Sequence, residues 1–208
     1  MIQLGENAHQ DFKFAITDSR KIARSLSAFA NTGGGRLLIG VKDNGKIAGI
    51  KSDEEYYMVE SASKLYSRPE VFFTPKIWRY EGKTVLEVSV PESKSKPHYV
   101  IESDGSKNAF VRVNDQNIKA NQVIRKVWEL RKQKKDRLVR YTEAEESLFR
   151  IFQEMGSVNL TQFKKKARLS NDLAVKTLAN MLVFDLVEME IDEYRTTYFL
   201  KIEKSVND

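Results

Sequence analysis

The sequence predicts an α+β protein of two domains joined by a basic segment. Residues 1–118 carry short apolar runs that alternate with two helical patterns, as in mixed α/β structure. Residues 141–208 have the pattern of three short helices followed by a β-hairpin. Residues 119–140 contain 9 Lys and Arg but only 2 Asp and Glu, and are expected to form a basic connecting helix.

The first domain is expected to begin with a strand near Phe12. A helix over 19–31 places its apolar residues on one face, and the glycines at 33–35 end it. The remaining expected elements are a strand over 37–41 that turns at Asn44-Gly45 into a return strand over 47–50, a helix over 53–67, paired strands over 72–80 and 85–90, and a hairpin over 99–101 and 110–113. Trp78 and Tyr80 are expected in the core, with base stacking as the alternative if their shared strand face is exposed.

In the second domain, helices are expected over 142–155, 160–167 and 171–184, followed by strands over 186–191 and 197–202. Thr142 with Glu145 three residues later has the pattern of a capping box. Three helices followed by a hairpin is the order of a winged helix-turn-helix domain, in which the third helix is the recognition helix. The prediction is therefore a winged helix over 141–208.

Composition excludes several classes of protein. The chain has no Cys and only two His, which excludes a disulfide framework and most zinc sites. No apolar run approaches the length of a membrane span, and the polar N-terminus lacks a signal-peptide core, so we expect no membrane association and a cytoplasmic location. The glycines at 33–35 follow a helix and precede a strand, the reverse of a P-loop, which argues against ATP binding.

The run Phe29-Ala30-Asn31-Thr32-Gly33-Gly34-Gly35-Arg36-Leu37-Leu38-Ile39-Gly40-Val41-Lys42-Asp43-Asn44-Gly45-Lys46-Ile47-Ala48-Gly49-Ile50, with the upstream Asp11-Phe12-Lys13, resembles the AlbA-2 domain of Schlafen proteins. The resemblance covers about residues 4–118. It implies an α/β domain and, for bacterial members, DNA binding or transcription regulation.

The same resemblance raises a nuclease alternative. Some Schlafen proteins are RNA endonucleases that use three acidic residues, and the matching positions here are Glu6, Asp11 and Asp43. Three converging carboxylates can hold Mg²⁺ or Mn²⁺ ions that activate water. Apart from this alternative, no cofactor or metal is expected. Asp11 stands where the family pattern has Glu, and Asp43 also suits the turn at Asn44-Gly45 as a purely structural residue.

Nucleic-acid contact is expected from basic and polar residues that the sequence places in the motif, the basic segment and the winged helix. These are Lys13, Arg36, Arg125, Arg131, Lys132, Lys134, Lys135, Lys164, Lys165, Lys166, Arg168, Asn171, Lys176, Thr177, Asn180 and Arg195.

The function predicted from the sequence is that of a DNA-binding transcriptional regulator, expected to act as a homodimer and to prefer DNA over RNA. Enzymatic activity is not assigned. Two alternatives stay open: the metal-dependent ribonuclease, and a protein-interaction module in which the winged helix binds protein. Residues 141–208 hold 9 Lys and Arg against 12 Asp and Glu, and this negative balance is the reason for the second alternative.

Overall fold

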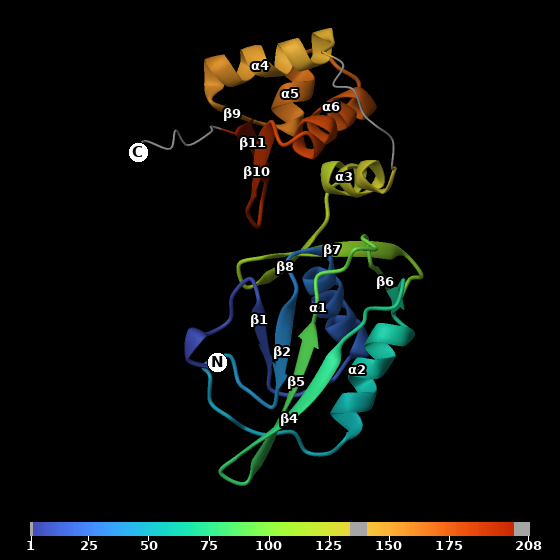
Figure 1. Cartoon of the computed structure of the whole chain (residues 1–208), viewed down its shortest axis with the longest axis vertical. Coiled ribbons are helices and arrows are strands. Elements are labelled where there is room, and N and C mark those ends of the chain that lie inside the picture. Colours follow the sequence, from blue (N-terminus) through green and yellow to red (C-terminus); the bar gives the residue numbers. More distant parts are fainter. Residues whose placement is uncertain (1, 134–140, 202–208) are drawn as a thin grey trace. The chain divides into compact units, whose positions relative to one another are not determined.

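A computed structural model describes residues 2–133 and 141–201, and the chain divides into two compact units, Met1–Ala120 and Asn121–Asp208 (Figure 1). The expected basic helix over 119–140 differs from the structure. Lys119 ends strand β8, and helix α3 spans Gln122–Lys132 within the second unit. Lys134 and Lys135 lie outside the described residues.

The first unit contains two four-stranded sheets. One has the order β1-β2-β5-β4, with β1 and β2 parallel and the other pairs antiparallel; the second has the order β3-β6-β7-β8. A short 3-10 helix at Ile2–Leu4 precedes them. The strands are β1 (Gln10–Lys13), β2 (Gly35–Ile39), β3 (Ser67–Arg68), β4 (Thr74–Tyr80), β5 (Lys83–Val90), β6 (Tyr99–Ile101), β7 (Lys107–Val113) and β8 (Gln116–Lys119).

Helices α1 (Ser19–Asn31) and α2 (Glu54–Lys64) complete the first unit. Asp18 caps α1 by accepting a hydrogen bond from the backbone N–H of Arg20. Leu26 and Phe29 of α1 are fully buried in a core that includes Leu37 of β2, Val88 of β5 and residues of β6 and β7. The helix therefore packs against both sheets, and its burial ties them into one core.

Two expectations for the first unit are wrong. The return strand over 47–50 is reduced to a single bridge between Val41 and Ile47, because Ile50 already bonds to Thr84 of β5. Trp78 and Tyr80 were expected in the core, yet every residue of β4 is exposed. β4 lies at the edge of its sheet (Figure 1), and none of its residues belongs to a buried core cluster among the described residues of the unit.

The second unit packs four helices with a three-stranded antiparallel sheet of order β10-β11-β9. Besides α3, its elements are α4 (Glu143–Met155), β9 (Ser157–Asn159), α5 (Leu160–Lys166), α6 (Asn171–Val183), β10 (Val187–Ile191) and β11 (Thr196–Leu200). The capping box of Thr142 and Glu145 is present at the start of α4. Leu148, Phe163, Leu178 and Tyr198 are almost fully buried in the core of this unit, which also contains Val123 and Val127 of α3.

Candidate nucleic-acid interface

The three acidic residues of the motif do not form one cluster among the described residues. Glu6 and Asp11 are joined through a side-chain hydrogen bond, and Glu6 Oε1 also accepts the backbone N–H of Phe12 at 2.9 Å. Asp43 is exposed in the turn after β2. Over residues 2–133 and 141–201, no group of three or more His, Asp or Glu side chains is placed to hold a metal ion.

Asp11 is part of a buried ion-pair network centred on Arg112 of β7. The Arg112 guanidinium donates to the carbonyl oxygens of Asn7 (3.3 Å) and Gln10 (3.1 Å) and to Oδ1 of Asn117 (3.0 Å), and it lies 3.4 Å from Oδ1 of Asp11. Both ion-pair side chains are almost inaccessible, at 1% for Arg112 and 3% for Asp11. This network joins β1 to the β7–β8 hairpin of the other sheet.

The other atoms of Asp11 are also occupied. Its Oδ2 accepts a hydrogen bond from the Ser25 hydroxyl at 3.1 Å, and Lys13 Nζ lies 3.0 Å from the same oxygen. Burial alone raises the pKa of Asp11, but the hydrogen bond from Glu6 and the charges of Lys13 and Arg112 outweigh it, so the pKa is lowered. Burial, followed by the hydrogen bond to Asp11, raises the pKa of Glu6.

These contacts fit a structural network better than a metal-ligand set. A Mg²⁺ or Mn²⁺ ion needs several free carboxylate oxygens in one small shell. Both oxygens of Asp11 are taken by cationic or hydroxyl donors. Of the three carboxylates predicted for the nuclease alternative, only those of Glu6 and Asp11 lie together. Both of them make hydrogen bonds that stabilise the fold.

The two cations predicted in the motif lie in different settings. Lys13 Nζ is tied to Asp11 and to the carbonyl oxygen of Phe12 at 2.8 Å, so much of its charge is balanced within the protein. Arg36 of β2 remains 39% exposed and lies 3.9 Å from Oε1 of Glu87 on β5. Arg36 thus faces solvent on the sheet surface next to β5.

In the second unit, the predicted cations after the middle of α5 form a dense basic group. Lys165, Lys166 and Arg168 are exposed and Lys164 is half-buried. Lys166 lies 3.6 Å from Glu154, a weak exposed pair. We call these four residues the α5 basic cluster. Arg168 has φ of 54°, in the left-handed region that favours Gly or Asn.

The residues of α6 that were expected to contact nucleic acid are less accessible in the structure than the sequence suggests. Thr177, predicted to contact nucleic acid, is 1% exposed because α3 and the core of the unit pack against α6. Asn171 is hydrogen bonded to Gln122 of α3 at 2.8 Å. The exposed side of α6 is a narrow stripe that includes Lys176, with Asn180 half-buried.

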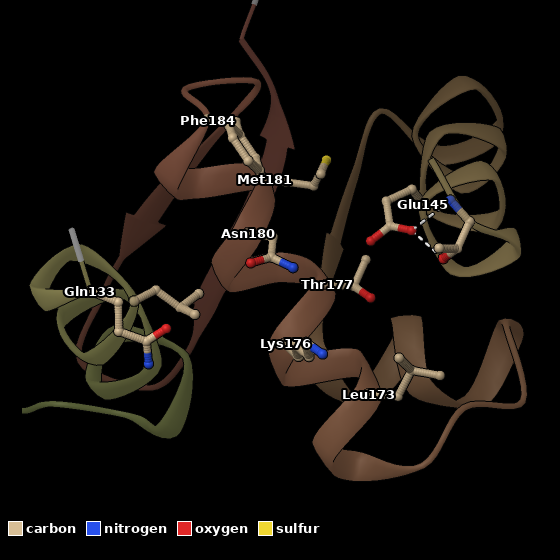
Figure 2. Close-up of a pocket in the computed structure, with 10 residues that line it drawn as sticks. Gln133, Glu145, Leu173, Lys176, Thr177, Asn180, Met181 and Phe184 are labelled. Atoms are coloured by element: carbon tan, nitrogen blue, oxygen red, sulfur yellow. Dashed lines mark hydrogen bonds between the residues drawn. The ribbon is translucent and has the colours of Figure 1, made fainter. Parts of the chain in front are cut away.

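Lys176 and Asn180 of this stripe line a pocket of about 440 Å³. Gln133 at the end of α3 forms one wall, and Glu145 near the start of α4 lies on the opposite side, with Lys176 and Asn180 between them (Figure 2). A helix that reads the major groove has to protrude from the protein surface. Of the side chains predicted to read bases, Lys176 is exposed and Asn180 is half-buried, so α6 offers few polar groups that could reach base edges.

The remaining predicted cations lie on exposed positions of the second unit. Arg125, Arg131 and Lys132 are exposed on α3, and Arg195 lies in the turn between β10 and β11 with its side chain 72% exposed. Arg195 Nε donates to Oδ2 of Asp192 at 3.3 Å, which orients it at the turn.

Two functional features were missed or misplaced by sequence reasoning. The strand neighbours of Arg112 suit either face, so the alternation does not mark this residue as buried. The spacing of Trp78 and Tyr80 predicts a shared strand face but does not distinguish a core face from the exposed face that β4 presents. The charge of Arg112 in an otherwise apolar strand, Ala109–Val113, was the one available signal.

Comparison with known proteins adds a family match. The family model described as "Schlafen, AlbA_2" matches residues 6–121. A crystal structure of the DIP2311 protein from Corynebacterium diphtheriae is similar, with 17% identity, a TM-score of 0.46, and coverage of 79% of this chain and 31% of that chain. The solution structure of the N-terminal domain of a putative ATP-dependent DNA helicase RecG-related protein from Nitrosomonas europaea has 24% identity, a TM-score of 0.40, and coverage of 51% and 78%.

The chain thus spans about a third of the length of the Corynebacterium protein. A search of curated proteins found none that matches. Among the described residues, no helix is long and apolar enough to cross a membrane.

Proposed function

This chain belongs to the Schlafen AlbA_2 family, and from that premise we propose that it is a nucleic-acid-binding protein whose second unit holds the backbone of duplex DNA. The observation that carries the proposal is the α5 basic cluster, in which four cations occur within five residues. Phosphate contacts by such cations supply much of the affinity of nucleic-acid-binding proteins.

We further propose that the second unit is a winged helix domain. The order α4, β9, α5, α6, β10, β11 supports this assignment, with β9 pairing to β11 of the hairpin. In that assignment α5, the turn at Arg168 and α6 form the helix-turn-helix. Ser170 caps α6 next to the cluster, so the positive end of the helix and the cations face a phosphate from adjacent positions.

The conformation of Arg168 supports a functional role for that turn. A residue other than Gly or Asn at positive φ is uncommon and costs stability, so such positions are often retained for function. Arg168 places a cation where the backbone alone favours Gly.

Thr177 is buried and Asn171 is hydrogen bonded to Gln122, so we assign no base reading to α6. Binding through the cluster would depend mainly on the backbone, with little sequence preference and a steep dependence on salt. Transcription regulation, homodimerisation and a cytoplasmic location stay predictions. The protein-interaction alternative predicts no salt-dependent binding to nucleic acid.

The proposal is tested with the double variant Lys164→Gln/Lys165→Gln. Fluorescence anisotropy with a labelled duplex of random sequence, at fixed salt, is expected to show binding weakened at least about tenfold, because two phosphate contacts are lost. Lys126→Gln/Arg150→Gln is the matched control, since both residues are cations of the same unit in local pairs with Glu129 and Glu146. Equal affinity of the cluster variant and the control would refute the assignment of the interface.

A further inference from the structure

Strand β4 presents an aromatic and basic surface in the first unit. It pairs with β5 on one side and forms the edge of its sheet (Figure 1), and all seven of its residues are exposed. Lys76, Trp78 and Tyr80 alternate along the strand and so lie on one face. Trp78 is 39% exposed and Tyr80 is 56% exposed, although large aromatic side chains are normally mostly buried.

The indole ring of Trp78 is held in a fixed orientation. Its Nε1–H donates to Oε2 of Glu87 at 2.5 Å, and Lys76 Nζ lies 4.0 Å from the ring centroid. Glu87 is 7% exposed and also accepts the Ser89 hydroxyl at 3.3 Å. A ring that is both anchored and open to solvent loses little conformational freedom when a flat partner stacks on it.

The charges around the two rings suit a polyanion. In register with β4, the neighbouring strands add Lys83 opposite Tyr80 and Arg36 close to Glu87. Glu87 itself is engaged with Trp78, Ser89 and Arg36, so its charge is partly balanced. The cations on this face are Arg36, Lys76 and Lys83, whereas Arg79 alternates to the other face of β4.

The spacing of the rings distinguishes a single strand from a duplex. Side chains two residues apart on a strand are separated by about 7 Å. Stacked bases in a duplex strand follow each other at about 3.4 Å. Successive bases can therefore reach both Trp78 and Tyr80 only after they have unstacked, which a single strand does at low cost.

We propose that the exposed face of β4 binds single-stranded nucleic acid by stacking bases on Trp78 and Tyr80, with Lys76 and Arg36 contacting phosphates. This site is separate from the α5 basic cluster and does not depend on duplex binding by the second unit. The edge itself is poorly suited to adding a strand from a second copy, because Pro75 lacks an N–H and Lys76 and Arg79 flank it with charge.

The test uses the full chain and a thymidine 15-mer as probe. The sequence contains two Trp, and Trp128 is 6% exposed, so emission from a Trp128→Phe background reports on Trp78. We expect saturable quenching of this emission on adding the 15-mer. Trp78→Ala should weaken binding of a labelled 15-mer at least about fivefold, and Trp78→Phe, which keeps a ring, should weaken it less.

Tyr57→Ala is the control, because Tyr57 is a 62% exposed aromatic residue of α2 in the same unit. It should bind the 15-mer as the wild type does. In a Lys164→Gln/Lys165→Gln background, Trp78→Ala should still weaken 15-mer binding by the same factor, which separates this proposal from the proposed duplex interface. Absence of quenching, or equal binding by Trp78→Ala and wild type, would overturn the proposal. The proposal would also be overturned if Trp78 emission fell as the protein concentration rose in the absence of the 15-mer, because a second copy of the chain would then cover β4.

Discussion

Replacement of Arg112 by Met should strongly destabilise the first unit. The substitution keeps a long side chain but removes the guanidinium, which has four acceptors and is 1% exposed. Asp11 would remain buried but would lose Arg112, the cation that pairs with it from the neighbouring sheet. Removing one member of a buried ion pair typically costs about 3–5 kcal/mol. The Ser25 hydroxyl and Lys13 stay close to Asp11, so we expect a loss near the lower limit, about 3 kcal/mol.

The free energy of unfolding is measured by urea denaturation in the Trp128→Phe background, where Trp78 fluorescence reports on the first unit. Lys64→Met is the matched control, because it removes only an exposed pair with Glu60 on α2 and should leave the free energy of unfolding nearly unchanged. In Arg112→Met/Asp11→Asn the stranded charge is gone, so the double variant should lose less than the sum of the single variants. A loss below about 1 kcal/mol for Arg112→Met would refute the structural role of the network.

Two further predictions concern the same unit. Glu6→Gln keeps an acceptor for the Phe12 N–H and a donor for Asp11. Folding raises the pKa of Glu6 above its usual value of 4.5. The stabilisation by Glu6 is therefore complete below pH 4.5 and is lost as the pH rises through the pKa of the folded state. Urea denaturation from pH 4 to 8 should therefore show the variant gaining on the wild type with increasing pH, and a constant difference would contradict this. Gly35→Ala would place Cβ 2.3 Å from Cδ1 of the buried Phe29, so we expect a loss of about 1–3 kcal/mol in thermal or urea unfolding. Gly33→Ala, whose Cβ meets only the exposed His9 ring, should cost less, and equal losses would contradict the packing argument.

The local elements of this fold follow from short-range patterns. The apolar face of α1, the capping box before α4 and the cap at Ser170 are all written within a few residues, so their helices could be predicted with small errors at the ends. The glycines after α1 were correctly given a structural role, since Gly35 lies against Phe29.

The misassigned features depend on tertiary arrangement. The alternation in β4 does not show whether its aromatic face is covered by other elements, and only the structure shows that Trp78 lies on an exposed edge strand. Thr177 falls on the expected outer side of α6, but α3, which was expected to be a connector, packs on that helix. Arg112 is buried because its acceptors come from β1 and from the segment before it, about a hundred residues earlier in the chain.

The central claim is that the second unit contacts DNA phosphates through the α5 basic cluster, and the salt dependence of duplex affinity tests it most directly. A plot of log K against log[salt] for the wild type should be linear and steep. Because each phosphate contact contributes a slope of about −0.9, Lys164→Gln/Lys165→Gln should be shallower by about 1.8. A wild type that binds no duplex at low salt, or a cluster variant with an unchanged slope, would contradict the account.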